Sequence, residues 1–325
     1  MKNIAILVPE TAIIEAVADP HYMFNAVNQF LQHSGRAPLF KVQLIGMTKE
    51  VKLNGSLFTV HTDKLLKEVG KVDLIFIPAI SGNINEALRM NKKMLPWLVK
   101  QYENGSEIAS LCIGAFLLAA TGLLEGKKCS THWNAANEFR QMFPNVTLVD
   151  GSVITEDKGI YTSGGANSYW TLLLHLVEKY TDRETAVLAS KYFAVDIDRN
   201  SQAAFAMFQG QKDHKDECIK TAQNYIEDNI EDKISVDDLA DRVSLGRRSF
   251  ERRFKQATNN SVLEYIQRVK IEAAKRSFEN SRNNINEVMY QVGYTDTKAF
   301  RSVFKKMTGL TPVEYRNKYN KMAMA

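Results

Sequence analysis

The sequence has few cysteines and no long apolar run, and each of these absences excludes a class of protein. Its three cysteines among 325 residues have no Cys-x-x-Cys spacing, which excludes a disulfide framework and a cysteine zinc site. The longest apolar stretch, residues 111–124, is interrupted by glycine and threonine and is too short to span a bilayer. The apolar residues near the N-terminus are too few for a signal-peptide core. We therefore expect a cytoplasmic protein without a membrane partner, and we expect neither a metal nor a cofactor.

The first two thirds of the chain also lack a net charge. Residues 1–216 carry 22 Lys and Arg against 22 Asp and Glu, so the whole excess of +5 lies in the rest of the chain. From residue 242 onward the counts are 18 against 7. A basic segment next to a neutral one indicates a nucleic-acid-binding module, because phosphate contacts supply most non-specific affinity. A solvated helical face would give the same counts, so charge alone leaves both interpretations open.

The length allows two domains of ordinary size, and the two parts of the chain have different patterns. The first part alternates β-branched runs with helical spacing, which predicts a doubly wound α/β fold with strands at 4–8, 40–45, 72–78 and 107–111. Helices are expected at 13–31, 86–104, 168–180 and 182–190. Residues 196–216 have little periodicity and indicate a linker, so the first domain is expected to span residues 1–195.

The last part of the chain predicts an all-α domain over residues 217–325. Helices are expected at 217–229, 236–243, 247–256, 262–280, 285–292, 297–307 and 312–319. This part repeats itself, because Phe250, Phe254 and four further residues recur 50 positions later, and the apolar residues before them recur 49 positions later. We therefore expect two helix-turn-helix units joined by one long helix.

The second helix of each unit has two different faces. Phe250 and Phe254 are four residues apart and are expected to point into the core of their own unit. The opposite face carries donors and acceptors of the kind that read base edges in a major groove. The candidate DNA contacts are Arg248, Ser249, Glu251, Arg252 and Lys255 in the first unit, and Thr297, Lys298, Arg301, Ser302 and Lys305 in the second. One such helix would be an ordinary amphipathic helix, but two copies within the basic third favour DNA binding.

Three runs in the second unit form a signature: Gly293-Tyr294-Thr295-Asp296, Phe304-Lys305-Lys306 and Gly309-Leu310-Thr311-Pro312. This signature resembles that of AraC/XylS-type transcription regulators, and the resemblance covers about residues 217–320. It implies a tandem helix-turn-helix domain whose two recognition helices enter successive major grooves of double-stranded DNA. In the first unit, Ser244 stands where the family usually has glycine.

The first part of the chain contains a cysteine in the position of a nucleophile. An apolar strand ends directly before Cys112 and a small-residue helix start follows it, which is the layout of a nucleophile elbow. At such an elbow the helix dipole favours the thiolate. His132 lies 20 residues further on, and Gly164 and Gly165 form a glycine-rich loop before a helix. A buried structural cysteine remains the alternative.

Together with the strand and helix order, these residues resemble the ThiJ/PfpI superfamily, a flavodoxin-like, class I glutamine amidotransferase-like fold, over residues 1–190. The resemblance implies that Cys112 is flanked by His132 and by an acidic residue near the first helix, which is Glu15 here. A ThiJ/PfpI-like domain ahead of an AraC-type domain is the arrangement of GlxA-family transcriptional regulators. In that family the first domain resembles an enzyme but serves mainly to sense an effector and to dimerise.

These resemblances imply a homodimeric transcription regulator that binds double-stranded DNA. A small-molecule effector would bind in a pocket formed by Cys112, His132, Glu15, Gly164 and Gly165, and RNA polymerase is a further candidate partner. A cysteine-dependent enzyme of the amidase, hydratase or glyoxalase type is one alternative. A redox switch at Cys112 is another.

Overall fold

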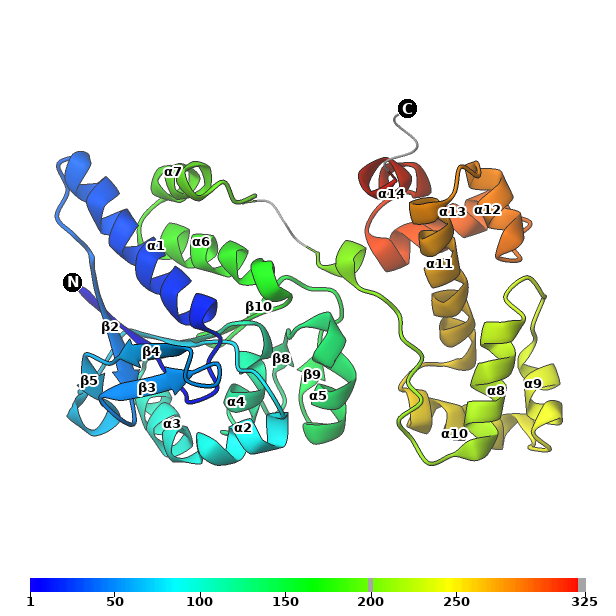
Figure 1. Ribbon diagram of the computed structural model, residues 1–325, viewed down its shortest axis with the longest axis horizontal. Helices are drawn as coiled ribbons and strands as arrows, with labels where there is room; N and C mark the ends of the chain where they lie inside the picture. Colours follow the sequence, from blue (N-terminus) through cyan, green and yellow to red (C-terminus); the bar gives the residue numbers. More distant parts are fainter. Residues whose placement is uncertain (198–200, 321–325) are drawn as a thin grey trace. The chain divides into compact units, whose positions relative to one another are not determined.

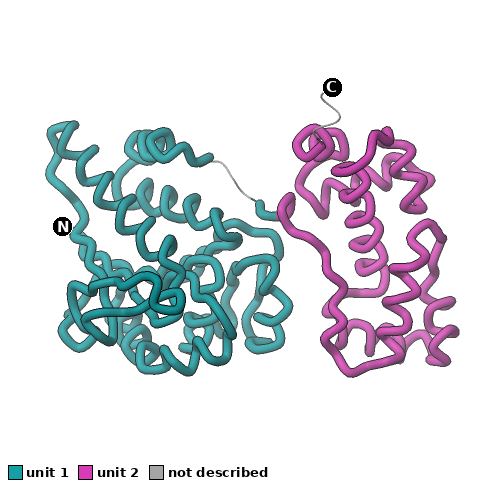
Figure 2. The backbone as a smooth tube through the Cα atoms, in the orientation of Figure 1, with its two compact units in different colours: residues 1–202 teal, residues 203–325 magenta. Residues whose placement is uncertain are grey.

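The computed structural model describes residues 1–197 and 201–320, and the chain forms two compact units, residues 1–202 and 203–325 (Figure 1, Figure 2). The division falls inside the stretch 196–216 that the sequence indicated as a linker; its residues 198–200 lie outside the described part, as do residues 321–325 of the expected second domain. Phe208 packs against a core of the second unit, so this unit begins earlier than residue 217. Within the described part, no helix has both the length and the apolar character that crossing a bilayer requires.

A sheet of seven strands forms the centre of the first unit. The strands are β1 (Lys2–Leu7), β2 (Phe40–Gly46), β5 (Lys64–Leu65), β6 (Leu74–Ile77), β7 (Glu107–Ser110), β10 (Ile154–Asp157) and β11 (Ile160–Ser163). Their order is β10-β11-β7-β6-β1-β2-β5, and all neighbours are parallel except β10 and β11. Two small separate sheets pair β3 (Glu50–Leu53) with β4 (Phe58–His61) and β8 (Lys128–Cys129) with β9 (Thr147–Leu148).

Helices cover both faces of the large sheet (Figure 1). One face packs against α1 (Ile14–His33), α6 (Tyr169–Tyr180) and α7 (Arg183–Phe193). The other packs against α2 (Ile84–Met90), α3 (Leu95–Glu103), α4 (Ala115–Ala119) and α5 (Ala136–Met142). Successive side chains of a strand point to opposite faces, so Ile6 of β1 lies in the first core and Leu7 in the second. The doubly wound fold predicted from the sequence is confirmed.

The single helix predicted over residues 86–104 is wrong, because the chain forms α2 and α3 with a 3₁₀ turn, η2 (Lys92–Met94), between them. Asn91 ends α2, where its side-chain amide donates to the Ala87 carbonyl and its Oδ1 accepts from the Glu10 N–H at 3.0 Å. Pro96 then stands in the first turn of α3, where a missing N–H costs nothing. A buried asparagine side chain bonded to a distant segment therefore breaks the helix.

Seven helices make up most of the second unit, and each ends within two residues of its predicted bounds. They are α8 (Glu217–Asp228), α9 (Val236–Arg242), α10 (Arg247–Thr258), α11 (Val262–Asn280), α12 (Ile285–Gln291), α13 (Thr297–Thr308) and α14 (Pro312–Tyr319). A short 3₁₀ turn, η6 (Ala203–Phe205), precedes them. The described residues of this unit include no strand, as predicted.

The second unit has two hydrophobic cores, one for each helix-turn-helix copy, and α11 contributes to both. Its residues up to Val269 pack into the first core, and those from Ile271 onward pack into the second. Each core contains a buried tyrosine that donates to a glutamate of the preceding long helix, Tyr265 to Glu227 of α8 and Tyr315 to Glu279 of α11. The internal repeat therefore extends to α8 and α11.

The turns of the two copies have the same backbone conformation although their residues differ. Ser244 has φ +53° where the second copy has Gly293 with φ +70°. Asn259 ends α10 in the left-handed region, as Gly309 ends α13. Glycine is required only in the second copy, because a Cβ on Gly293 would overlap the backbone carbonyl of Glu231.

Candidate functional site

The outward face of α10 presents most of its predicted DNA contacts to solvent. Phe250 and Phe254 are fully buried on the inner face, as the sequence predicted. On the outer face Ser249 is half-buried, and four predicted residues are exposed: Arg248, Glu251, Arg252 and Lys255.

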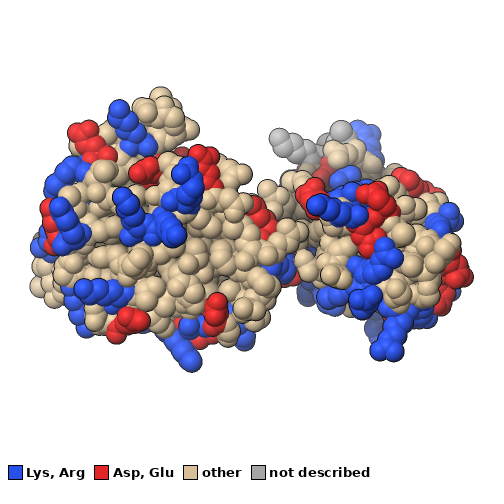
Figure 3. All heavy atoms as spheres, turned by 90° about the horizontal axis from the view of Figure 1, so that it is seen from below, with Lys and Arg blue, Asp and Glu red and all other residues tan. Residues whose placement is uncertain are grey.

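The outward face of α13 has the same arrangement. Phe300 and Phe304 are fully buried. Thr297 at the start of the helix is half-buried, and the remaining predicted contacts are exposed: Lys298, Arg301, Ser302 and Lys305. In Figure 3, Lys and Arg side chains gather on the visible face of the second unit, the right-hand body. Two helices of the same fold therefore offer solvent-facing cations and hydroxyls.

Several cations of α10 are bound within the protein. Arg247 pairs with Asp237 at 3.0 Å and with Glu251 at 3.5 Å, so one predicted contact, Glu251, is already held by a neighbour. Arg253 donates twice to Asp216, the residue that caps α8. These ion pairs fix α10 against α8 and α9.

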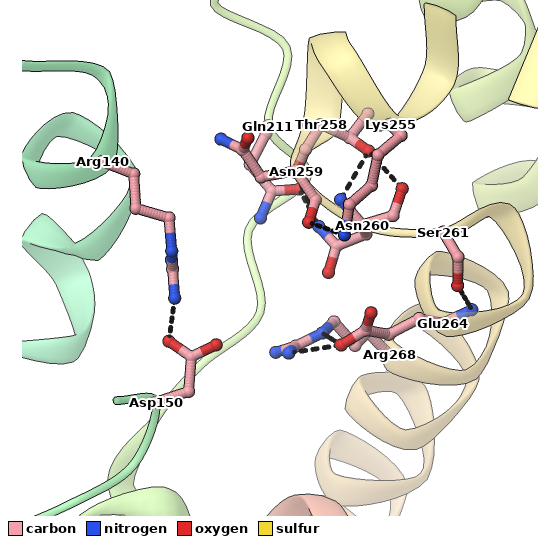
Figure 4. Close-up of polar contacts among 10 residues, drawn as sticks. All are labelled: Arg140, Asp150, Gln211, Lys255, Thr258, Asn259, Asn260, Ser261, Glu264 and Arg268. Atoms are coloured by element: carbon pink, nitrogen blue, oxygen red, sulfur yellow. Dashed lines mark hydrogen bonds and ion pairs between the residues drawn. The ribbon is translucent and has the colours of Figure 1, made fainter. Parts of the chain in front are cut away.

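The C-terminal end of α10 is fixed by side-chain hydrogen bonds (Figure 4). Lys255 Nζ donates to the Asn259 carbonyl at 3.0 Å. The Thr258 hydroxyl accepts from the Asn260 N–H at 3.1 Å, and the Asn260 side chain donates to Gln211 at 3.2 Å. Ser261 then caps α11, accepting from the Glu264 N–H. Lys255 is therefore exposed, but its ammonium group already donates a hydrogen bond within the protein.

Two cations of α10 and four of α13 have neither an ion pair nor a hydrogen bond among the described residues: Arg248, Arg252, Lys298, Arg301, Lys305 and Lys306. Unpaired surface cations are available to phosphate and base oxygens without first breaking an internal contact. Five of these six were among the predicted contacts; Lys306 was not, although its place in the repeat beside Lys305 could have indicated it.

Cys112 lies on the sharp turn expected of an elbow. It follows β7, opens a 3₁₀ turn, η3 (Cys112–Gly114), and has φ +55°, a conformation that side chains rarely adopt. The turn packs so closely that a Cβ on Gly114 would come within 2.5 Å of the Pro78 carbonyl. The cysteine itself is only 4% exposed.

Two other loops meet at this turn. The Cys112 N–H donates to the Ser163 hydroxyl at 3.2 Å, and the Thr131 hydroxyl donates to the Cys112 carbonyl at 3.2 Å. Thr131 precedes His132, and Ser163 precedes the glycine-rich loop. The structure therefore brings together the three backbone segments that contain Cys112, His132 and Gly164. The roles of Ser163 and Thr131 had no signal in the sequence.

The side chains do not form an activated nucleophile. Burial raises the pKa of the Cys112 thiol to about 11, so the thiolate expected from the helix dipole is disfavoured. His132 Nδ1 accepts from the Asn134 N–H at 3.1 Å, and burial lowers the pKa of this imidazole. Glu15 is exposed in the first turn of α1. Among the described residues, Cys112 has no hydrogen bond to either His132 or Glu15.

A tyrosine and an aspartate that the sequence did not indicate lie near the cysteine. The Tyr169 hydroxyl donates to Asp19 at 2.6 Å. The pKa of Tyr169 is raised, mainly by burial. The hydrogen bond and charge of Asp19 raise it further, as do the charges of Glu15 and Cys112. Burial raises the pKa of Asp19 as well. Tyr169 thus interacts electrostatically with Asp19, Glu15 and Cys112.

The glycine-rich loop is occupied by another part of the chain. The Gly165 N–H donates to the Gln202 side-chain oxygen at 2.9 Å, and a Cβ on Gly164 would overlap the Gln202 amide. Gln202 lies in the stretch that the sequence indicated as a linker. Within residues 1–197 and 201–320, no group of three or more His, Cys, Asp or Glu is placed to hold a metal ion.

Two family models match the chain, that of the DJ-1/PfpI family over residues 25–179 and that of a helix-turn-helix domain over residues 239–318. The HTH-type transcriptional regulator GbdR of Pseudomonas aeruginosa is 25% identical over 241 residues, which are 73% of this chain. The chain spans 65% of the length of GbdR. The HTH-type transcriptional regulator CdhR of the same species is 23% identical over 263 residues, 79% of this chain and 76% of CdhR.

A solved structure of a candidate transcriptional regulator from Vibrio parahaemolyticus is similar with a TM-score of 0.53 and 19% identity. The similarity covers 59% of this chain and 98% of the other. At this identity it shows a shared fold.

Proposed function

We propose that this chain, in which a DJ-1/PfpI domain precedes an AraC-type helix-turn-helix domain, regulates transcription by binding double-stranded DNA through α10 and α13. The observation that carries the proposal is the outward face that these two helices repeat, with cations that no ion pair holds within the described residues. Arginine and lysine on such helices contact guanine edges and phosphates. GbdR and CdhR are named as HTH-type transcriptional regulators, which supports the same function here.

The first unit would control DNA binding by sensing a small molecule near Cys112. Three loops converge there, and burial raises the pKa of the Cys112 thiol, which opposes the thiolate. An effector site needs only shape and polar contacts, whereas a cysteine enzyme needs a thiolate and a base within hydrogen-bond reach. The raised pKa of Cys112 therefore supports sensing over catalysis.

DNA binding is tested on the full chain by fluorescence anisotropy across a series of salt concentrations. Affinity is expected to fall steeply, because the slope of log K against log salt is about −0.9 per phosphate neutralised. Arg301→Ala should weaken binding, whereas Arg276→Ala, at an exposed arginine that belongs to α11 and to neither recognition helix, should not. An affinity that is the same at low and physiological salt would contradict the proposal.

Sensing and catalysis are separated by Cys112→Ser, a nearly isosteric change. On the sensing proposal, effector-dependent DNA binding stays within a few-fold of the wild type. Loss of a catalytic nucleophile would instead reduce turnover by roughly 10³-fold or more. Robust turnover of an amide or glyoxal-type substrate that disappears in Cys112→Ser would establish the enzyme.

We also propose a homodimer formed through the first unit. In that unit α1 and α7 expose Tyr22, Leu188 and Tyr192, which are 53%, 47% and 55% accessible. Sedimentation of the full chain at micromolar concentration should show a dimer, and Leu188→Glu should weaken it. A strict monomer in the wild type would rule the dimer out.

A further inference from the structure

A glutamine side chain is fully bonded within the glycine-rich loop of the first unit. Gln202 is 2% exposed and is the last residue of that unit. Its Oε1 accepts from the Gly165 N–H at 2.9 Å, and its Nε2 donates to the carbonyls of Thr131 at 3.0 Å and Ser152 at 3.1 Å. The Gln202 backbone N–H donates to the Gly151 carbonyl at 2.9 Å. The carboxamide therefore has a partner for its oxygen and for both of its N–H groups.

These partners select a primary amide. One N–H donor and two carbonyl acceptors match a group with one acceptor oxygen and two N–H donors. A carboxylate would place an oxygen against two carbonyls, and an ammonium group would leave the Gly165 N–H without an acceptor. Gly164 keeps the space open, because a Cβ there would overlap the amide. The cradle formed by Gly165, Thr131 and Ser152 is thus specific in its chemistry.

The cradle is connected to the site around Cys112. Thr131 binds Gln202 through its carbonyl and donates to the Cys112 carbonyl through its hydroxyl. The Ser168 hydroxyl is buried, has no hydrogen-bond partner among the described residues and lies 2.9 Å from the position of a Cβ on Gly165. Buried hydroxyls are normally bonded, so this one is available to a polar ligand beside the amide position.

Gln202 is also joined covalently to the start of the second unit. The Ala206 carbonyl accepts from Lys275 at 2.6 Å, and the Phe208 N–H donates to Glu272 at 3.0 Å. Lys275 and Glu272 form a buried ion pair on α11, the helix shared by the two helix-turn-helix copies. Three residues therefore separate a side chain anchored in the first unit from a backbone anchored on α11.

We propose that the cradle is a primary-amide subsite, filled by Gln202 in the absence of effector and taken over by an effector that carries a primary amide. Displacement of Gln202 frees the segment that leads to α11, so that binding in the first unit alters DNA binding by the second. The identification of the ligand as the effector rests on the proposed function. The exchange between Gln202 and an amide does not.

Propionamide, which has the carboxamide and two carbons of a glutamine side chain, is the probe. In the full chain with Gln202→Ala the cradle is vacant, and propionamide is expected to bind with a Kd on the order of millimolar. At roughly ten times that Kd the melting temperature should rise by about 3 °C. The wild type should show a smaller shift at the same concentration, because the tethered Gln202 side chain competes with propionamide for the cradle.

Matched controls separate the subsite from general effects of the probe. Gln209→Ala removes an exposed glutamine and should behave as the wild type. Gln202→Leu fills the cradle without polar atoms and should not respond, and propionate should not stabilise Gln202→Ala. If circular dichroism shows that Gln202→Ala does not fold, Gln202→Asn is used instead. Its shorter amide cannot reach all three partners, so propionamide should still bind, but more weakly than it would to a vacant cradle. Equal shifts in all variants, or no shift in a folded Gln202→Ala or Gln202→Asn chain, would overturn the subsite.

The link to DNA is measured separately. Gln202→Ala should change the affinity of the full chain for DNA by at least about fivefold, the lower end of ordinary coupling between sites, and Gln209→Ala should not change it. Equal affinities would overturn the coupling. Because the thermal shifts are measured without DNA, failure of the wild type to bind DNA would count against the proposed function and not against the subsite.

Discussion

The two helix-turn-helix copies have the same fold but use their charges differently. In α10, three of five cations are bound within the protein: Arg247 to Asp237 and Glu251, Arg253 to Asp216, and Lys255 to a carbonyl. In α13, no lysine or arginine has an ion pair or a hydrogen bond among the described residues. Three cations therefore hold α10 in place, whereas α13 leaves all four of its cations exposed to solvent.

The residues at matched positions differ as well. Fifty positions after Glu251 the second copy has Arg301, and fifty after Arg252 it has Ser302. Glutamate accepts from cytosine, arginine donates to guanine, and serine can do either. The repeat keeps the buried phenylalanines and changes these outward residues, so on the proposed function the two helices would read different base sequences. The comparison shows that the outward-facing residues of the two helices can change while the buried core residues stay the same.

The largest effect is expected from the feature that the copies share. Phe254→Ala and Phe304→Ala each remove a fully buried ring, and each should lower the free energy of unfolding by about 3–5 kcal/mol. Urea denaturation monitored by far-UV circular dichroism measures both. A cost below about 1 kcal/mol in either variant would show that the two cores are not equivalent.

Arg252→Ala and Arg301→Ala should separate the two reading faces. Each removes a candidate contact to guanine worth roughly 1–3 kcal/mol of discrimination. Binding measured against a randomised DNA library should show relaxed preference in a different half of the site for each variant. If both variants relax the same base pairs, the two helices do not read separate half-sites.

The starts of the two recognition helices provide a smaller contrast. Asp296 caps α13 by accepting from the Ala299 N–H at 2.7 Å, whereas Gly246 caps α10 without a side chain. Asp296→Ala should cost about 1 kcal/mol of stability. Gly246→Ala should cost less than half of that, because no cap is lost and a Cβ there meets nothing within 4 Å. Thermal denaturation of the two variants side by side measures the difference, and equal losses would show that the Asp296 cap adds nothing.

The smallest effect distinguishes the lysines near the ends of the two helices. Lys305→Ala should reduce the salt slope of DNA binding by about 0.9, as expected for one phosphate contact. Lys255→Ala should reduce it by less, because Lys255 Nζ already donates to the Asn259 carbonyl. Equal reductions measured by anisotropy would mean that this internal bond breaks on binding without cost.

The helices of the second unit could be predicted from the sequence because their signals are local. Ser235, Ser261 and Thr311 cap three of them through bonds to residues three positions on, and apolar residues follow the helical period. Strand β11 was not predicted from the sequence. All four of its residues are buried, but two of them, Thr162 and Ser163, are polar and do not give the apolar pattern of a buried strand. Their hydroxyls bond to distant segments, so no local pattern indicates a strand.

The sharp turn at Cys112 could be predicted from the sequence, whereas the burial of its thiol could not. The spacing indicated the elbow, and the positive φ of Cys112 agrees with it. Burial by segments that no spacing reveals raises the pKa of Cys112, which opposes the thiolate that the elbow layout favours. Gln202 had no sequence signal, since Gly165 and Thr131 lie 37 and 71 residues away. Net charge, the internal repeat and residue spacing can be read directly from the sequence. Burial and hydrogen bonds between distant segments depend on the folded structure and cannot.

The shared helix α11 sets the distance and the relative rotation of the two helix-turn-helix copies. Its 19 residues give an axis of roughly 28 Å, and its side chains pass from one core to the other between Val269 and Ile271. One residue inserted there would advance the second copy by about 1.5 Å and rotate it by about 100°, leaving each copy intact but misaligned on the duplex. Seven inserted residues, about two full turns, would bring back the rotation and lengthen the spacing by roughly 10 Å. On the proposed function, the length of this helix would determine which arrangements of half-sites on DNA the protein accepts.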